Sequence, residues 1–142
     1  MEWLYLQAES LSQKARDMKL LGNVIWIVFG GFVLAVEYLM AGLMLCCTII
    51  GIPFGWQIIR LASLALWPFG TEVRYKKQSP SFLNTFMNVL WILIGGIWLA
   101  LEHFILGVLF CITIIGIPFG KQHFKLATIA FTPFGREIVY SD

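Results

Sequence analysis

Two long apolar runs dominate the pattern of hydrophobic and polar positions along the chain. They extend over residues 24–54 and 86–119. Their only acidic residues are Glu37 in the first run and Glu102 in the second, with His103 next to the latter. About 20 consecutive apolar residues are enough for a helix to cross a bilayer. The pattern therefore predicts an all-α integral membrane protein.

The two runs belong to an internal duplication. The eight residues 48–55, Thr-Ile-Ile-Gly-Ile-Pro-Phe-Gly, return letter for letter at 113–120, and from residue 23 onward the halves align at a constant offset of 65 residues. We expect an amphipathic N-terminal segment (1–19), a first membrane repeat (20–74), a basic linker (75–84), and a second membrane repeat with a short tail (85–142). Duplicated membrane proteins commonly pack their repeats about a pseudo-two-fold axis, and we expect the same here.

Each repeat also contains a shorter segment after its Ile-Pro-Phe-Gly break. In residues 56–67 and 121–132 a polar side chain recurs at every third position, with apolar residues on the other side. This spacing predicts an amphipathic helix that lies at the membrane interface.

Charge placement bears on how often each apolar run crosses the membrane. With a single crossing per run, the basic residues of the linker would lie opposite those of the N-terminal segment, against the positive-inside rule. A tight helical hairpin that turns near Glu37 and Glu102 would instead keep all ten Lys and Arg residues on one face, the cytoplasmic one. We favour two tandem repeats, each a membrane helical hairpin followed by an amphipathic interfacial helix, with both termini cytoplasmic. The arms of such hairpins are short, so they could also be re-entrant.

Composition excludes several function classes. Hydrophobic residues make up 59% of the chain and charged residues 13%, whereas soluble domains have about a quarter charged. The net charge of +2 is too small to indicate nucleic acid as a partner. Three cysteines lie inside the apolar runs without metal-type spacing, so we interpret them as packing residues. With no nucleophile motif or phosphate-binding loop either, we expect neither an enzyme nor a cofactor or metal.

Glu37 and Glu102 are the first candidate site. Ionisable groups inside a membrane are costly and commonly functional, so the pair could line a permeation or ion-binding path. The alternative is that they mark the hairpin turns and contact water in the headgroup region. Tyr38 and His103 follow the two carboxylates and break the symmetry of the repeats, and we expect His103 to be a solvated side chain rather than a ligand.

The duplicated helix-break motif is the second candidate. Glycine and proline free backbone groups that lipid cannot satisfy, and paired breaks in two halves of a transporter often bind ions or substrates. Alternatively, water and the following helix satisfy these groups at the cytoplasmic end. The motif residues are Thr48, Gly51, Pro53, Gly55, Thr113, Gly116, Pro118 and Gly120.

Other polar and small residues have structural interpretations. Asn23 and Asn88 open the apolar runs and are predicted as helix N-caps, whereas both motif threonines should bond back to the carbonyl one turn earlier. Small residues four positions apart allow close helix packing in lipid, and they predict a homo-oligomer. The clearest of them are Gly31, Ala35, Gly96 and Ala100.

The repeated motifs resemble a known family. The duplicated Asn-Val-x-Trp, the Gly-Gly pair and Thr-Ile-Ile-Gly-Ile-Pro-Phe-Gly, followed by Pro-Phe-Gly-x-Glu, are similar to the YccF-type bacterial inner-membrane proteins. The resemblance covers residues 20–140. It implies a multi-pass inner-membrane protein but supplies no catalytic or binding residue.

Two function hypotheses follow. The first is a small homo-oligomeric channel or transport-related protein in which the carboxylates or the broken helix ends meet the permeant. The second is a structural or accessory subunit that binds another membrane protein through its small-residue faces and basic helices. In both, the lipid bilayer is the first partner.

Overall fold

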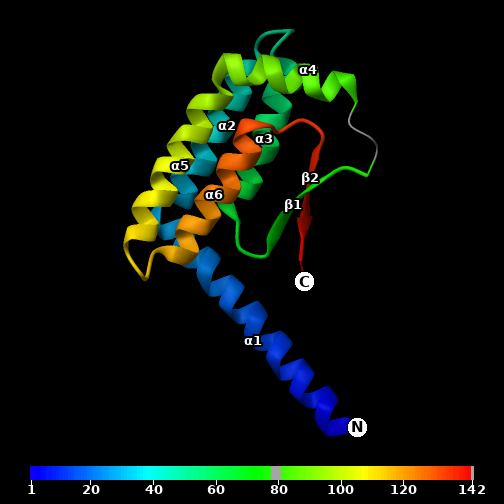
Figure 1. Ribbon diagram of the computed structural model, residues 1–142, viewed down its shortest axis with the longest axis vertical. Coiled ribbons are helices and arrows are strands. Elements are labelled where there is room, and N and C mark those ends of the chain that lie inside the picture. The colour runs from blue at the N-terminus through cyan, green and yellow to red at the C-terminus, as the bar shows by residue number, and fades with distance from the viewer. Residues whose placement is uncertain (78–80, 142) are drawn as a thin grey trace.

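The computed structural model describes residues 1–77 and 81–141 (Figure 1). These residues are mainly helical, and the all-α membrane class expected from the sequence is confirmed. In chain order the elements are α1 (Glu2–Trp26), η1 (Ile27–Gly31), α2 (Phe32–Cys46), α3 (Ile52–Leu66), β1 (Thr71–Tyr75), α4 (Phe82–Trp91), η2 (Ile92–Gly96), α5 (Ile97–Ile112), α6 (Ile117–Phe131) and β2 (Arg136–Tyr140). The segments η1 and η2 are single π-helical turns, and α1 projects away from the helix bundle (Figure 1).

Equivalent contacts in the two repeats show how the repeats pack together. The ring of Phe54, at the start of α3, stacks on Trp91 at the end of α4, with 6.3 Å between centroids. Correspondingly, Trp26 at the end of α1 stacks on Phe119 at the start of α6, at 6.4 Å. The beginning of α3 or α6 therefore meets the end of the first helix of the other repeat. A pseudo-two-fold axis therefore relates the two repeats, as the duplication predicts. This axis is perpendicular to the helix bundle.

The pseudo-two-fold axis passes between the two short strands, β1 and β2. They pair antiparallel, and Val73 lies opposite Ile138. These two residues are 65 positions apart, so they are equivalent in the two repeats and the axis runs between them. The strands were not predicted from the sequence, because their partners lie in different repeats and each strand has only five residues.

Each repeat does contain a helical hairpin, but it is not the predicted one, because its turn and its second arm lie elsewhere. Glu37 and Glu102 lie inside α2 and α5, so the turn predicted at these positions is wrong. The chain reverses instead over the motif, between Cys46 and Ile52 in the first repeat. Pro53 begins the return helix rather than only ending the previous one, because a first-turn proline lacks an N–H that would have no partner anyway.

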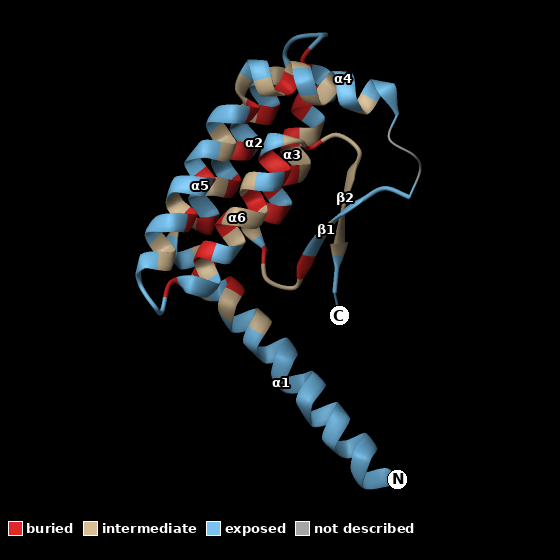
Figure 2. Ribbon diagram, in the orientation of Figure 1, coloured by how far each residue is buried: buried red, intermediate tan, exposed pale blue. Residues whose placement is uncertain are grey.

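The return helices α3 and α6 form the inner layer of the molecule. Ile58, Leu61 and Leu64 of α3 and Leu126 of α6 are at most 1% exposed. The segments predicted as separate interfacial helices are thus the second arms of the hairpins, and their apolar sides make the core. Figure 2 shows the buried residues concentrated where these helices face α2 and α5.

Glycine pairs kink both long helices beside a tryptophan. Gly30 has φ +132°, which L side chains rarely adopt. A Cβ on Gly31 would lie 2.1 Å from the Trp26 ring, whose Nε1 donates a 2.7 Å hydrogen bond to the Ala65 carbonyl. Gly96 makes the same room for Trp91, whose Nε1 donates to Ala130 at 2.8 Å. Gly31 and Gly96 therefore accommodate indole rings. Ala35 on α2 is buried, and its equivalent Ala100 on α5 is half-buried.

Asn23 and Asn88 are not N-caps, because Asn23 lies within α1 and Asn88 within α4. Each side chain instead binds the backbone of the loop that follows the second hairpin helix of its own repeat, α3 or α6. The Asn23 amide donates to the Phe69 carbonyl at 2.8 Å and accepts from the Phe69 N–H at 2.9 Å. Asn88 makes the same two bonds with Phe134, at 3.0 and 2.9 Å. These clamps hold each kinked helix to the loop before a strand.

Apolar and basic residues are segregated in the molecule. The outer sides of α2 and α5 are apolar and exposed (Figure 2), and the two kinked helices, Glu2–Cys46 and Phe82–Ile112, are long and apolar enough to cross a membrane. All ten Lys and Arg residues lie instead in α1, α3, α6, the two strands and the residues directly after β1. The apolar helices form one end of the pseudo-two-fold axis, and the sheet forms the other.

Candidate functional site

A cavity of about 380 Å³ lies between the two repeats on the side of α2 and α5. Its walls come from η1 and α2 of the first repeat and from α5 and α6 of the second. Apolar side chains and the glycine kink supply most of the lining, and the polar groups are Glu37, Glu102 and His123.

The structure brings the two sequence-predicted carboxylates into this single cavity. Glu37 projects from α2 and Glu102 from α5, and both side chains are exposed at its rim. They occupy equivalent positions in the repeats, so they lie on either side of the pseudo-two-fold axis. Neither forms an ion pair within the described residues, where Arg74 and Glu72 make the one salt bridge.

A buried polar chain lies next to the carboxylates. The Tyr38 hydroxyl is 2.6 Å from His103 Nε2, and His103 Nδ1 is 3.1 Å from His123 Nδ1. All three side chains are at most 3% exposed. Since the two Nδ1 atoms face each other, one must carry a proton and the other must accept it, so the two rings cannot both be imidazolium. When Tyr38 donates to Nε2, His103 donates onward to His123.

The expectation that His103 is solvated is wrong, because it is buried together with Tyr38. Both are buried because they are equivalent residues that meet on the axis, where the phenol and the imidazole satisfy each other's hydrogen-bonding groups. His123 was missed from the sequence. The signal available was its counterpart in the first repeat, Ile58, since a polar residue replaces an apolar one there.

The helix-break motif forms closed turns. The Thr48 hydroxyl donates to the Leu45 carbonyl at 3.0 Å and accepts from the Gly51 N–H at 3.0 Å. This confirms the predicted threonine bond, and Thr113 and Gly116 repeat both contacts in the second turn. Gly55 packs on α2 so closely that a Cβ would lie 2.4 Å from the Gly42 carbonyl oxygen.

The remaining motif residues have similar positions. Pro53 and Pro118 lie in the first turns of α3 and α6. A Cβ on Gly120 would lie 2.4 Å from the sulfur of Cys111. The motif thus has a turning and packing role, and a binding or gating role for it stays a prediction.

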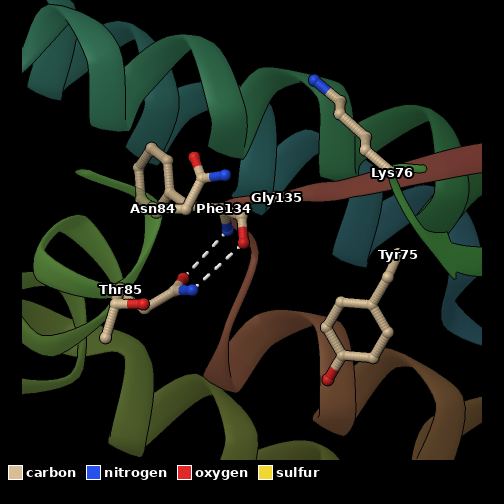
Figure 3. Close-up of a pocket in the computed structure, with 7 residues that line it drawn as sticks. Tyr75, Lys76, Asn84, Thr85, Phe134 and Gly135 are labelled. Atoms are coloured by element: carbon tan, nitrogen blue, oxygen red, sulfur yellow. Dashed lines mark hydrogen bonds between the residues drawn. The ribbon is translucent and has the colours of Figure 1, made fainter. Parts of the chain in front are cut away.

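Two further hollows lie beside the Asn clamps. One, of about 260 Å³, is shown in Figure 3, with Tyr75 and Lys76 on one side and Asn84 and Thr85 on the other. The second, of about 240 Å³, is its symmetry equivalent and contains Lys19 and Tyr140. No group of three or more His, Cys, Asp and Glu residues that could hold a metal ion occurs in residues 1–77 and 81–141.

Comparison with known proteins agrees with the repeat architecture. The model of the family YccF, described as an inner membrane component domain, matches the chain twice, over residues 21–71 and 86–136. The chain belongs to this family. The resemblance inferred from the duplicated motifs is thereby confirmed, and the protein is an inner-membrane component.

Curated relatives cover nearly the whole chain. The proteins called Inner membrane protein YccF from Escherichia coli (strain K12) and from Shigella flexneri are each 34% identical to it over 130 residues. The aligned region covers 86% of this chain and 88% of each relative. No solved structure matches the chain.

Proposed function

We propose that this YccF-family protein is a small transport-related membrane protein, in which Glu37 and Glu102 bind a cation, in the first place a proton. The observation that carries the proposal is the meeting of these two carboxylates in one cavity. They are 65 residues apart, yet they line the same space together with His123, on a surface that is otherwise apolar.

The energetics of the carboxylate pair support cation binding. An ionised carboxylate inside a bilayer is costly unless it is paired with a positive charge. Two carboxylates that share one site repel each other, so a proton or another cation held between them relieves both costs. Because no Lys or Arg of the described residues lines the cavity, we infer that the charge comes from outside it.

The distribution of basic residues supports one orientation in the membrane. The cytoplasmic side of membrane proteins is enriched in Lys and Arg. All ten such residues avoid α2 and α5. We therefore place the pseudo-two-fold axis normal to the membrane, with the sheet and both termini cytoplasmic and the α2–α5 side in the bilayer. The number of complete crossings per repeat stays a prediction.

The exposed rim of the cavity also supports a homo-oligomer. Glu37 and Glu102 are exposed at the rim of the cavity, where lipid would otherwise meet them. A second copy that covers this rim would shield the carboxylates from lipid. Native mass spectrometry of the detergent-solubilised protein should therefore detect an oligomer, whereas a monomer at all detergent concentrations would contradict this part of the proposal.

Proton flux into liposomes tests the function. The protein is reconstituted with an internal pH-sensitive dye, and a potassium diffusion potential set with valinomycin drives proton entry. We expect faster entry than in protein-free vesicles, and loss of that entry in Glu37→Gln and Glu102→Gln. Glu72→Gln is the matched control, because it removes the same chemical group from the exposed sheet.

Flux indistinguishable from that of empty vesicles, for protons and then for sodium or potassium, would overturn the transport proposal. The accessory-subunit hypothesis would then take its place. The structure gives it less support, because Gly42 and Gly55 pack against each other inside the hairpin and are not available to a partner.

A further inference from the structure

Three hollows that share lining residues follow one another along α1. The first is the basic hollow of about 240 Å³, which lies between α1, the loop after α3 and the end of β2 and includes Lys19 and Phe69. These two residues also line the next hollow, of about 320 Å³. Ile25 and Phe119 join that hollow to a third, of about 260 Å³. We call this whole feature the α1 groove.

The first part of the groove is positively charged. Arg16 and Lys19 line it, and among the residues that the structure describes no carboxylate does. The Arg16 guanidinium donates to the Gln13 side chain at 2.7 Å, and Lys19 Nζ donates to the Ser141 hydroxyl at 3.2 Å. Both partners are neutral, and the described residues contain no ion pair at either cation. Two charges and a hydroxyl thus surround a space that suits a phosphate group.

The rest of the groove is apolar and faces the membrane side. Beyond Lys19 its walls are Met18, Leu21, Ile25, Phe29 and several residues of α5, α6 and their connecting turn. Apart from Lys19, Thr113 is the polar side chain among the described residues that line these two hollows. The 13 residues from 16 to 29 span about 20 Å along a helix. One leaflet of bilayer hydrocarbon is roughly 15 Å thick, so a groove of this length can hold a lipid chain.

We propose that the α1 groove binds one anionic phospholipid, with its phosphate at Arg16 and Lys19 and one acyl chain along α1 toward Phe29. The orientation derived from the basic residues agrees with this, because it puts α1 where the cytoplasmic headgroups meet the hydrocarbon. Juxtamembrane cations attract anionic lipids in that layer.

The second repeat supplies an internal comparison. At the positions equivalent to Arg16 and Lys19 it has Ser81 and Asn84, and Lys76 is the one cation of the equivalent hollow. The phospholipid should therefore bind at the α1 groove in preference to the hollow shown in Figure 3.

Binding is measured on the purified protein in neutral detergent, by native mass spectrometry and by the shift in thermal unfolding. Phosphatidylglycerol is compared with phosphatidylcholine carrying the same acyl chains, and with inorganic phosphate and glycerol 3-phosphate. We expect binding of phosphatidylglycerol that weakens roughly 30-fold in the double variant Arg16→Gln/Lys19→Gln. The charge-matched control Lys14→Gln/Lys77→Gln should bind as the wild type does.

Each other outcome decides against the proposal. If inorganic phosphate or glycerol 3-phosphate stabilises the protein as well as the lipid does, the ligand is a free anion. If phosphatidylcholine binds with the same affinity and the double variant has no effect, the groove binds acyl chains without selecting the charge of the headgroup. Should the double variant fail to fold, Lys19→Arg must keep the affinity and Lys19→Gln alone must lower it.

Discussion

Replacing Asn23 by alanine should destabilise the protein strongly, because this side chain makes two hydrogen bonds to the backbone of Phe69. Asn23 is fully buried, so water cannot take over its role. The substitution removes the fully buried partner of the N–H and the carbonyl of half-buried Phe69, each at a cost of roughly 1–3 kcal/mol. We expect the free energy of unfolding to fall by about 2–4 kcal/mol.

The duplication provides matched controls for this prediction. Asn88 makes the same two bonds, but it is half-buried beside the hollow of Figure 3, where water can reach the freed groups. Asn88→Ala should therefore cost about 1 kcal/mol. Asn84→Ala, in the same hollow, removes an amide with no hydrogen bond in the described residues and should cost almost nothing. Unfolding in mixed micelles followed by circular dichroism measures all three. Equal losses for Asn23→Ala and Asn84→Ala would refute the clamp.

Two further predictions concern packing and titration. Gly55→Ala should destabilise the first hairpin by about 1–3 kcal/mol, because its Cβ would overlap the α2 backbone, whereas Gly95→Ala has open space and should be neutral in the same unfolding assay; equal effects would contradict the close approach. Burial lowers the pKa of Lys125 to about 8, although Glu72 opposes the shift. The unfolded chain keeps this proton to higher pH, so the free energy of unfolding should rise between pH 8 and about 10.5. Lys125→Met should lose that rise, and an unchanged pH profile in the variant would show that another group causes it.

The repeat offset allowed the symmetric part of the structure to be predicted from the sequence. Residues 65 positions apart occupy equivalent places, so Glu37 and Glu102 could be paired before any fold was known. What the offset could not supply was the location of the turn. In an apolar run, hydrophobic periodicity carries little information, because every side of the helix contacts either lipid or another helix. For this reason the prediction that the acidic residues mark the turns is wrong.

Contacts between the repeats were the other feature that sequence patterns left open. The strands pair across 65 residues, and neither strand is long enough to be recognised by alternation alone. The Tyr38–His103–His123 chain lies where the two repeats differ. A position-by-position comparison of the repeats, rather than of their shared motifs, is the analysis that reveals such residues, since complementary groups replace identical ones at the axis.

Thiol labelling of the two turns tests the orientation of the axis most directly. An impermeant maleimide is applied to intact cells and to inverted vesicles, with single cysteines at Ile49, Ile114, Glu72 or Ser141 and the native cysteines replaced. If the axis is normal to the membrane, the equivalent turn positions 49 and 114 lie at the same depth and must give the same result. Positions 72 and 141 must label only from the cytoplasmic side. Labelling of 49 from one side and 114 from the other would contradict the account, because the axis would then lie in the membrane plane.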